Sequence, residues 1–259
     1  MKLKRFLSVL NGAAVALLFA TPAFAAAGDT PDTRADWDAL WHEVLVDITV
    51  IGVIFIVAAI YMLIRFKATS PEQVGTATKL SRANAIGWAL IPAAIFMADD
   101  FFLSAKGWTV WEHQRTVPEN AMEVKVTGYQ WKWQYEYIGE GVKFMSELRT
   151  PQDEIYGRAP KGEHYLREVT EPLVIPTNKK VRFLITGNDV IHSWWVPDFA
   201  VKRDAVPGLF TAAWAKTDQP GIYVGECTEL CGKGHAFMPI VVEVKEEVDL
   251  KSMTKAQLV

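Results

Sequence analysis

Two long apolar runs dominate the first half of the chain. Residues Ile48 to Ile64 contain no charged side chain, and at about 1.5 Å per residue such a helix spans the hydrocarbon core of a bilayer. A second run follows and is interrupted by Asp99 and Asp100, to which we assign no chemistry. The pattern predicts two membrane-spanning helices, at about residues 46–66 and 84–104, within an N-terminal region of residues 26–115.

The first residues have the pattern of a secretory signal. Basic side chains precede an apolar run, and Ala23-Phe24-Ala25 supplies small residues at the usual spacing for cleavage. We therefore expect residues 1–25 to be a signal peptide, which makes the chain an exported one.

Charges between the two predicted spans indicate their orientation. The loop carries four basic side chains and one acidic one, namely Arg65, Lys67, Lys79, Arg82 and Glu72. Positive loops stay in the cytoplasm. The C-terminal part of the chain is then expected on the outer side of the membrane.

After Pro118 the pattern changes to short alternating segments punctuated by Gly and Pro, which is typical of an all-β sandwich or barrel. We expect this domain to occupy residues 118–246, followed by a charged tail, 247–259. The predicted strands are Met122–Val126, Trp131–Tyr137, Val181–Thr186, Thr211–Lys216, Gly221–Glu226 and Ile240–Lys245. We read residues 150–163 as a long surface loop.

One predicted strand has an unusual number of aromatic residues. Every odd position from Tyr129 to Tyr137 is Tyr or Trp. Strict alternation would place all five rings on one face, and a core stripe is the simplest role for most of them.

Composition narrows the class of protein. The net charge is -3 at a pI of about 6.0, so the chain lacks the basic surface of a nucleic-acid binder. Half of the residues are hydrophobic, which fits a chain that is partly in a membrane and partly in water.

Candidate metal ligands are concentrated in one loop, Cys227 to Met238, which holds both cysteines of the chain, one histidine and one methionine. A structural disulfide, plausible in an oxidising compartment, would leave His235 and Met238 unexplained. Structural zinc could use Cys227, Cys231, His235 and the upstream His192, but it has no use for a thioether. Copper favours thiolate, imidazole and a weak axial methionine, and two thiolates point to two copper ions.

Four features together resemble subunit 2 of the bacterial haem-copper cytochrome c oxidases: the loop C-T-E-L-C-G-K-G-H-A-F-M-P, the segment V-I-H-S-W-W-V-P, the aromatic G-Y-Q-W-K-W-Q-Y-E-Y and the two preceding spans. The resemblance covers nearly the whole mature chain. It implies a two-helix transmembrane hairpin followed by a cupredoxin-like Greek-key β-barrel or sandwich that holds a dinuclear Cu(A) centre.

The resemblance also implies a set of ligands. Cys227 and Cys231 would bridge the coppers, His192 and His235 would each bind one, and Met238 would be an axial ligand. The backbone carbonyl of Glu229 would be the opposite weak ligand. Through its side chain, together with Asp204, Glu229 is further expected at a Mg or Mn ion shared with subunit 1.

Trp131 matches the tryptophan through which electrons reach the copper centre in this family. The resemblance further implies oxidase subunit 1, and subunit 3 as well, as partners in the lipid membrane, with cytochrome c as the electron donor. Three acids, Glu136, Glu140 and Asp189, could form a docking surface for a basic cytochrome, although a solvated charged face is the simpler role for each.

The chain departs from the family at one expected proton-uptake position, where Ala85 replaces a glutamate. That role is therefore not expected here. Three rival classes are less compatible with the sequence. A quinol oxidase subunit would lack the copper ligands, a copper chaperone would have a thioredoxin-like α/β pattern and one anchor, and a soluble protein of the nitrous-oxide-reductase type would lack the two spans.

Overall fold

A computed structural model describes residues 33–75, 81–116 and 119–248. The predicted signal peptide and nearly all of the predicted tail lie outside the described residues. The described helices are α2 (Thr33–Arg65), α3 (Arg82–Arg115) and α4 (Gln152–Ile155), with the 3-10 helices η1 (Pro197–Phe199) and η2 (His235–Phe237). The described strands are β1 (Met122–Tyr129), β2 (Lys132–Tyr137), β3 (Val142–Ser146), β4 (Leu173–Pro176), β5 (Val181–Gly187), β6 (His192–Val196), β7 (Val201–Ala205), β8 (Thr211–Ala215), β9 (Gly221–Cys227) and β10 (Pro239–Lys245).

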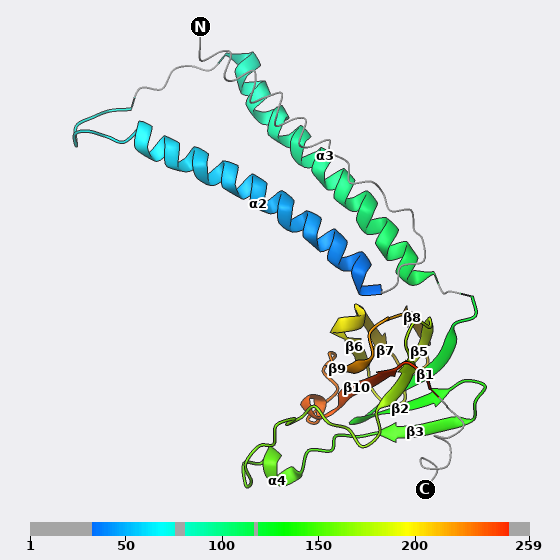
Figure 1. Cartoon of the computed structure of the whole chain (residues 1–259). Coiled ribbons are helices and arrows are strands. Elements are labelled where there is room, and N and C mark those ends of the chain that lie inside the picture. The colour runs from blue at the N-terminus through cyan, green and yellow to red at the C-terminus, as the bar shows by residue number, and fades with distance from the viewer. Residues whose placement is uncertain (1–32, 76–80, 117–118, 249–259) are drawn as a thin grey trace. The chain divides into compact units, whose positions relative to one another are not determined.

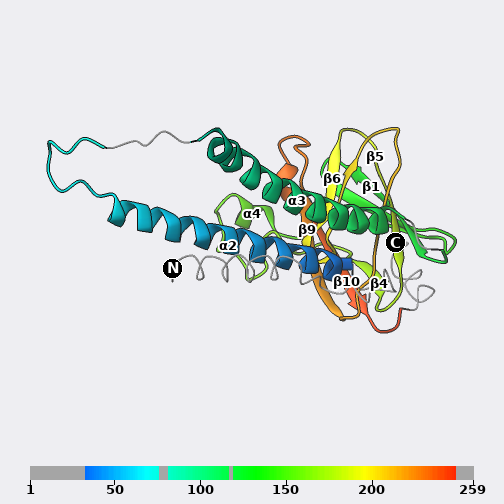
Figure 2. The same cartoon turned by 90° about the horizontal axis from the view of Figure 1, so that it is seen from above.

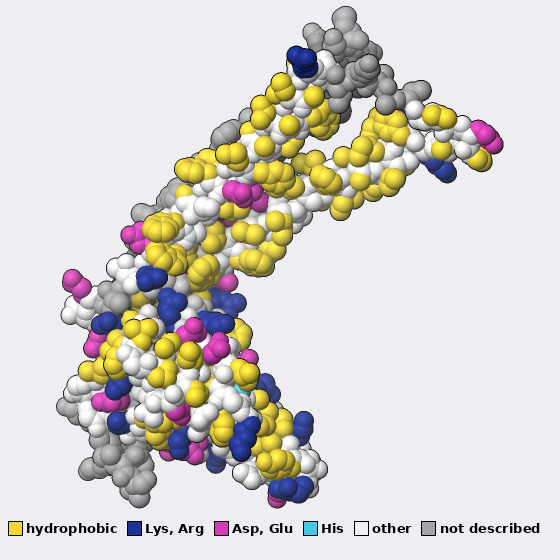
Figure 3. Space-filling view, turned by 180° about the vertical axis from the view of Figure 1, so that it is seen from behind, with side chains coloured by type: hydrophobic (Ala, Val, Ile, Leu, Met, Phe, Trp, Pro, Cys, Tyr) yellow, Lys and Arg dark blue, Asp and Glu magenta, His cyan; other side chains and the backbone are white. Residues whose placement is uncertain are grey.

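Helices α2 and α3 are antiparallel and are linked by ionic contacts near one end (Figures 1 and 2). His113 Nδ1 lies 2.8 Å from Asp36 Oδ2, and Lys106 pairs with Glu43. Along the rest of their length both helices expose apolar side chains, as Figure 3 shows. Each is long and apolar enough to cross a membrane, and between them they contain nearly all of the predicted spans.

The ten described strands form two five-stranded sheets (Figure 1). One has the order β3-β2-β1-β5-β8 and the other the order β4-β10-β9-β6-β7. Most neighbouring strands are antiparallel, but β1 is parallel to β5 and β10 is parallel to β4. The chain crosses between the sheets after β3, β4, β5, β7 and β8. Buried side chains of both sheets form one hydrophobic core, so the two sheets form a sandwich. The predicted order of two apolar helices and then a β-sandwich is confirmed.

The core lies between the sheets and contains most of the aromatic side chains of the β domain. Trp133, Phe183 and Trp194 are fully buried, and the rings of Phe183 and Trp194 pack with centroids 4.7 Å apart. Strands with apolar residues at alternate positions supply this layer from both sides.

Four strands of the described structure, β3, β4, β6 and β7, were not predicted. Three of them lack a clear alternation: β4 follows one proline and ends on another, β7 carries three charged residues in five, and four of the five residues of β6 are buried. Burial on both faces removes the period of two that alternation depends on. Strand β3 does alternate and was missed all the same. The predicted loop at residues 150–163 contains the short helix α4.

The aromatic segment also differs from its prediction. A turn at Gln130 and Trp131 separates β1 from β2, so Tyr129 lies on a different strand from the other rings. Trp133, Tyr135 and Tyr137 alternate inward along β2 and are fully buried. The prediction of one strand with five rings on one face is therefore wrong, whereas the core role of most of the rings is confirmed.

A buried tyrosine pair in β2 allows a test of this core. Tyr137 Oη donates to the Val174 carbonyl at 2.7 Å and accepts from the Val174 N–H at 3.0 Å. Tyr137→Phe leaves both groups without that partner, so we expect a loss of about 2 kcal/mol in the free energy of unfolding. Urea unfolding of the full chain in detergent, followed by tryptophan fluorescence, measures this loss.

Tyr135→Phe is the matched control. Tyr135 is equally buried on the same strand, but its Oη accepts only a long bond from Trp194 Nε1 at 3.4 Å. Its loss should stay below about 1 kcal/mol. Equal losses in the two variants would contradict the assignment.

Candidate metal centre

His192 begins strand β6 and is completely buried. No strand was predicted at this position, and the pairing of β6 with β7 and β9 fixes where His192 lies. Gly128 makes room for it, because a Cβ at that position would lie 2.8 Å from His192 Cδ2. The imidazole therefore enters the sandwich edge-on against the ring of Trp133.

The pairing of β6 with β9 brings His192 to the cysteine loop. Trp194 lies opposite Cys227, the last residue of β9, and the Thr228 N–H continues the ladder to the Ser193 carbonyl at 3.1 Å. Cys227 Sγ consequently lies 4.0 Å from His192 Nδ1. Two segments far apart in sequence therefore meet at one point.

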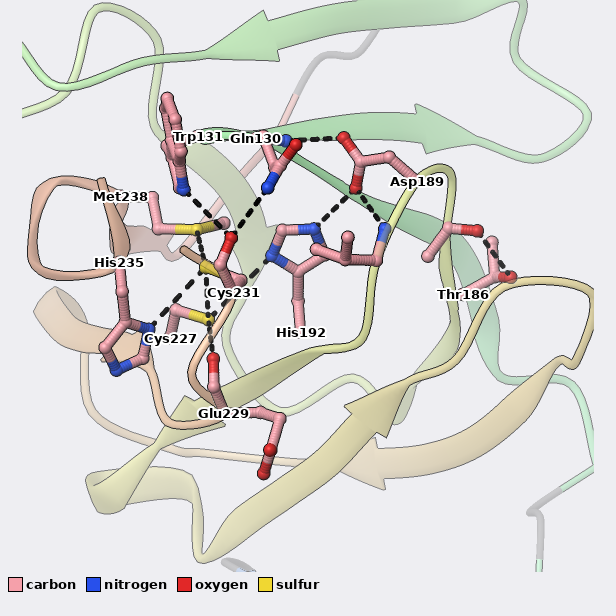
Figure 4. A network of polar contacts seen from close by, with 12 residues as sticks. Gln130, Trp131, Thr186, Asp189, His192, Cys227, Glu229, Cys231, His235 and Met238 are labelled. Atoms are coloured by element: carbon pink, nitrogen blue, oxygen red, sulfur yellow. Dashed lines mark hydrogen bonds and ion pairs between the residues drawn. The ribbon is translucent and has the colours of Figure 1, made fainter. Parts of the chain in front are cut away.

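The rest of the loop adds three more donor atoms (Figure 4). Cys231 Sγ lies 3.9 Å from Cys227 Sγ, 3.6 Å from His235 Nδ1 and 3.5 Å from Met238 Sδ. Met238 is fully buried, and its carbonyl accepts from Trp133 Nε1 at 3.2 Å. All the predicted side-chain ligands are brought together.

Both thiols are free in this arrangement. Their separation of 3.9 Å is well beyond the bond length of about 2.05 Å in a disulfide. Within the described part of the chain, the group of histidine, cysteine and acidic side chains close enough to hold a metal ion is His192, Cys227 and Cys231. A set with two thiolates, two imidazoles and one thioether fits copper better than zinc.

Asp189 fixes the orientation of His192. Its Oδ1 lies 2.8 Å from His192 Nε2 and accepts from the Val190 N–H at 2.7 Å, while its Oδ2 accepts from the Gln130 N–H at 2.8 Å. A proton on Nε2 leaves the Nδ1 lone pair directed at the sulfurs, which is how a carboxylate commonly orients a metal-binding histidine.

Charge in the site follows from burial and these contacts. Burial alone would raise the pKa of Asp189, but its hydrogen bonds with His192 and two backbone N–H groups outweigh burial and lower the pKa. Burial likewise opposes ionisation of Cys227, yet contact with His192 lowers its pKa. Burial and the adjacent Cys227 charge raise the pKa of Cys231. The sulfur pair therefore tends to keep one proton, which metal binding must displace.

Glu229 and Asp204 lie beside this cluster and not in it. The Glu229 carbonyl is 3.3 Å from Cys227 Sγ, while its exposed side chain points away from the sulfurs (Figure 4). Asp204 is exposed on β7 opposite Ser193. The Glu229 carbonyl is thus available to the sulfur cluster. The carboxylates of Glu229 and Asp204 are exposed and available to a group outside that cluster.

Trp131 packs on the cysteine loop from the β1–β2 turn. Its Nε1 donates to the Cys231 carbonyl at 3.2 Å, and the ring is partly buried against the core. Of the acids considered for docking, Glu140 is exposed, Glu136 lies 3.7 Å from Lys143, and Asp189 holds His192. Sequence reasoning missed Gly128, Gln130 and this role of Asp189, because none belongs to a ligand motif.

Fold and cluster together define a cupredoxin-like β domain, joined to two apolar helices, whose histidine and cysteine cluster is compatible with copper binding. The family described as "Cytochrome C oxidase subunit II, periplasmic domain" matches residues 122–245. A probable cytochrome c oxidase subunit 2 of Rickettsia bellii is 34% identical over 213 residues, which cover 81% of this chain and 76% of that protein. The chain belongs to the cytochrome c oxidase subunit 2 family, and the resemblance found in the sequence is confirmed.

Two further proteins are similar to this chain. Cytochrome c oxidase subunit 2 of Cereibacter sphaeroides is 39% identical over 175 residues, 62% of this chain but only 56% of that protein. The chain thus spans little more than half the length of that relative. The crystal structure of the periplasmic domain of subunit II of cytochrome oxidase (CoxB) of Bradyrhizobium japonicum is 38% identical, covering 55% of this chain and 96% of that chain, at a TM-score of 0.48.

The role of Asp189 can be tested through metal affinity. Asp189→Asn removes the charge that holds the Nε2 proton of His192, so we expect copper affinity to fall by about 10- to 100-fold. Competition with a copper chelator measures the affinity. Asp218→Asn, an exposed acid in the turn after β8, is the control and should bind like the original protein. A normal affinity in Asp189→Asn would mean that His192 needs no carboxylate to hold it.

Proposed function

We propose that this chain is the copper-bearing, electron-relay subunit of a cytochrome c oxidase. In this proposal it accepts electrons from cytochrome c at a dinuclear Cu(A) centre and passes them to haem in subunit 1. Reduction of dioxygen to water and the coupled proton translocation belong to the partner. The observation that carries the proposal is the convergence of two thiols, two imidazoles and a thioether within 4.0 Å contacts.

The donor set assigns a role to each side chain. Cys227 and Cys231 would hold the copper through their thiolates, His192 and His235 would each supply an imidazole nitrogen, and Met238 would supply its thioether sulfur. The Glu229 carbonyl, which lies 3.3 Å from Cys227 Sγ, would be an additional weak donor. Bound copper supplies a one-electron relay whose charge is shared between two ions.

The protein's own contribution is to keep these ligands still. A relay transfers electrons fast when its ligands move little between oxidation states, which a rigid β scaffold favours. Cys227 and His192 are held by the sheet, His192 also by Asp189, and Met238 by the indole N–H of Trp133. The buried, closely packed surroundings also exclude water from the sulfurs.

Trp131 is the proposed point of electron input. It is partly exposed, lies next to Cys231 and comes from a different loop than the ligands. Val190 and Ile191, just before His192, and Leu230, in the cysteine loop, are exposed. They provide apolar contact area for a docked cytochrome.

A second metal ion is proposed at the carboxylates of Glu229 and Asp204, shared with subunit 1. Strand pairing supports this, because both residues lie close to Ser193 of β6 along the backbone. Asp204 of β7 pairs with Ser193, and the backbone N–H of Thr228, the residue before Glu229, donates to the Ser193 carbonyl. The buried hydroxyls of Ser193 and Thr228 find no hydrogen-bond partner within the described residues. Orphaned buried hydroxyls are typical of a place where water or an ion belongs.

The proposed setting is the bacterial inner membrane. Helices α2 and α3 cross the lipid, the loop between them faces the cytoplasm, and the β domain lies in the periplasm, in contact with subunit 1 and in an assembly that includes subunit 3. Proton uptake is not assigned to this chain, because the methyl side chain of Ala85 carries no proton.

Spectroscopy of the copper-loaded chain tests the proposal. A dinuclear mixed-valence centre should give a seven-line EPR signal, because one unpaired electron couples equally to two copper nuclei. Met238→Leu should keep the seven lines with a shifted reduction potential, and Cys231→Ser should lose them. A four-line or silent spectrum from the original chain would rule out the dinuclear centre.

Electron input through Trp131 makes a separate prediction. Trp131→Gln in the assembled oxidase should slow electron transfer from reduced cytochrome c by at least about tenfold, since the aromatic route is lost, while the copper spectrum stays the same. Stopped-flow reduction of the copper centre measures the rate. Trp195→Gln, a partly buried tryptophan on β6, is the control, and an unchanged rate in Trp131→Gln would remove Trp131 from the route.

A further inference from the structure

Gln130 contacts both of the segments that carry the metal ligands, and no role has yet been given to it. Its backbone N–H donates to Asp189 Oδ2 at 2.8 Å, and its side-chain Nε2 donates to the Cys231 carbonyl at 2.8 Å (Figure 4). Asp189 in turn holds His192. One residue of the β1–β2 turn therefore links a histidine ligand to a cysteine ligand on another loop.

The Cys231 carbonyl is the point where this link meets Trp131. It accepts from Gln130 Nε2 at 2.8 Å and from Trp131 Nε1 at 3.2 Å. Two donors from adjacent residues converge on the backbone oxygen of a sulfur ligand. The shorter of the two bonds is made by Gln130.

Glycines in the ligand loop allow this close approach. A Cβ at Gly234 would clash with the indole, only 2.2 Å from Trp131 Cδ2, and a Cβ at Gly232 would lie 3.1 Å from Gln130 Nε2. Without side chains at these positions, the amide of Gln130 and the indole of Trp131 both lie directly on the backbone of the loop. The loop thus contacts the turn through its main chain.

We propose that Gln130 is a positioning residue that holds the Cys231 carbonyl against the indole of Trp131. This positioning role rests on the proposed function, because the contact matters to activity only if electrons pass from Trp131 to the metal centre. Gln130 acts through Trp131 and Cys231 and does not itself bind metal. Small displacements of a donor can cost about 100-fold in rate, so a contact that fixes the distance between indole and loop controls electron input.

A glutamine-to-methionine exchange tests the contact without changing side-chain length. Gln130→Met removes the Nε2 donor and keeps the backbone bond to Asp189. Gln134→Met is the matched control, because Gln134 lies on the adjoining strand β2 and its Nε2 contacts only Met145 Sδ, at 3.7 Å.

The first readout needs no metal and no activity. In the full chain in detergent, labelled with ¹⁵N-tryptophan and without copper, the indole N–H of Trp131 is assigned by its disappearance in Trp131→Phe. We expect its hydrogen exchange to be about tenfold faster in Gln130→Met, as the loss of one hydrogen bond predicts, and unchanged in Gln134→Met. Exchange at the original rate in Gln130→Met would overturn the proposal.

The second readout uses the copper-loaded oxidase. Gln130→Met should slow electron transfer from reduced cytochrome c by about tenfold, with the Kd of the cytochrome and the EPR signal unchanged. A weaker Kd with a normal transfer rate would overturn positioning in favour of docking. If the original chain gives no mixed-valence signal, the proposed function fails, while the exchange experiment still decides whether Gln130 holds Trp131.

Discussion

The pairing of β6 with β9 is the constraint on which the site depends. It places Trp194 opposite Cys227, and His192 and Cys227 therefore meet although they belong to different parts of the chain. Because side chains alternate along a strand, a shift of one residue in this register would turn His192 to the other face of the sheet. The buried ring of Trp194, packed on Phe183, anchors the register. The core and the candidate metal site are therefore specified together.

Close backbone approach is the second requirement. Gly128 lets the imidazole of His192 lie against β1, and Gly234 lets the ring of Trp131 lie on the cysteine loop. Any larger residue would force the His192 imidazole or the Trp131 indole to shift. Asp189 then connects the two regions, since its carboxylate holds both the imidazole and the β1–β2 turn. It acts on the ligand first, and its place in an acidic docking surface is secondary.

Much of this could be predicted from the sequence, and the exceptions have physical reasons. The two helices gave a clear signal because apolar runs are long and local, and the ligand loop because its donors are close in sequence. The position of His192 within β6 gave none, because that strand is buried on both faces and does not alternate. The break after Tyr129 was missed because the aromatic alternation continues through the turn. Gln130 and Asp189 act through contacts between loops, which no spacing in a single sequence encodes.

Rigidity is distributed unevenly over the proposed ligands. His192 and Cys227 belong to paired strands, and Met238 is buried next to β10. Cys231 and His235 lie in the intervening loop. Its backbone is held mainly by hydrogen bonds of short turns, such as that from the His235 N–H to the Gly232 carbonyl. Loops with few ladder bonds open most easily. Gln130 and Trp131 both donate hydrogen bonds to the carbonyl of Cys231, within this less firmly held loop. The turn through which electrons are proposed to enter therefore also restrains the proposed ligands that the sheet does not hold.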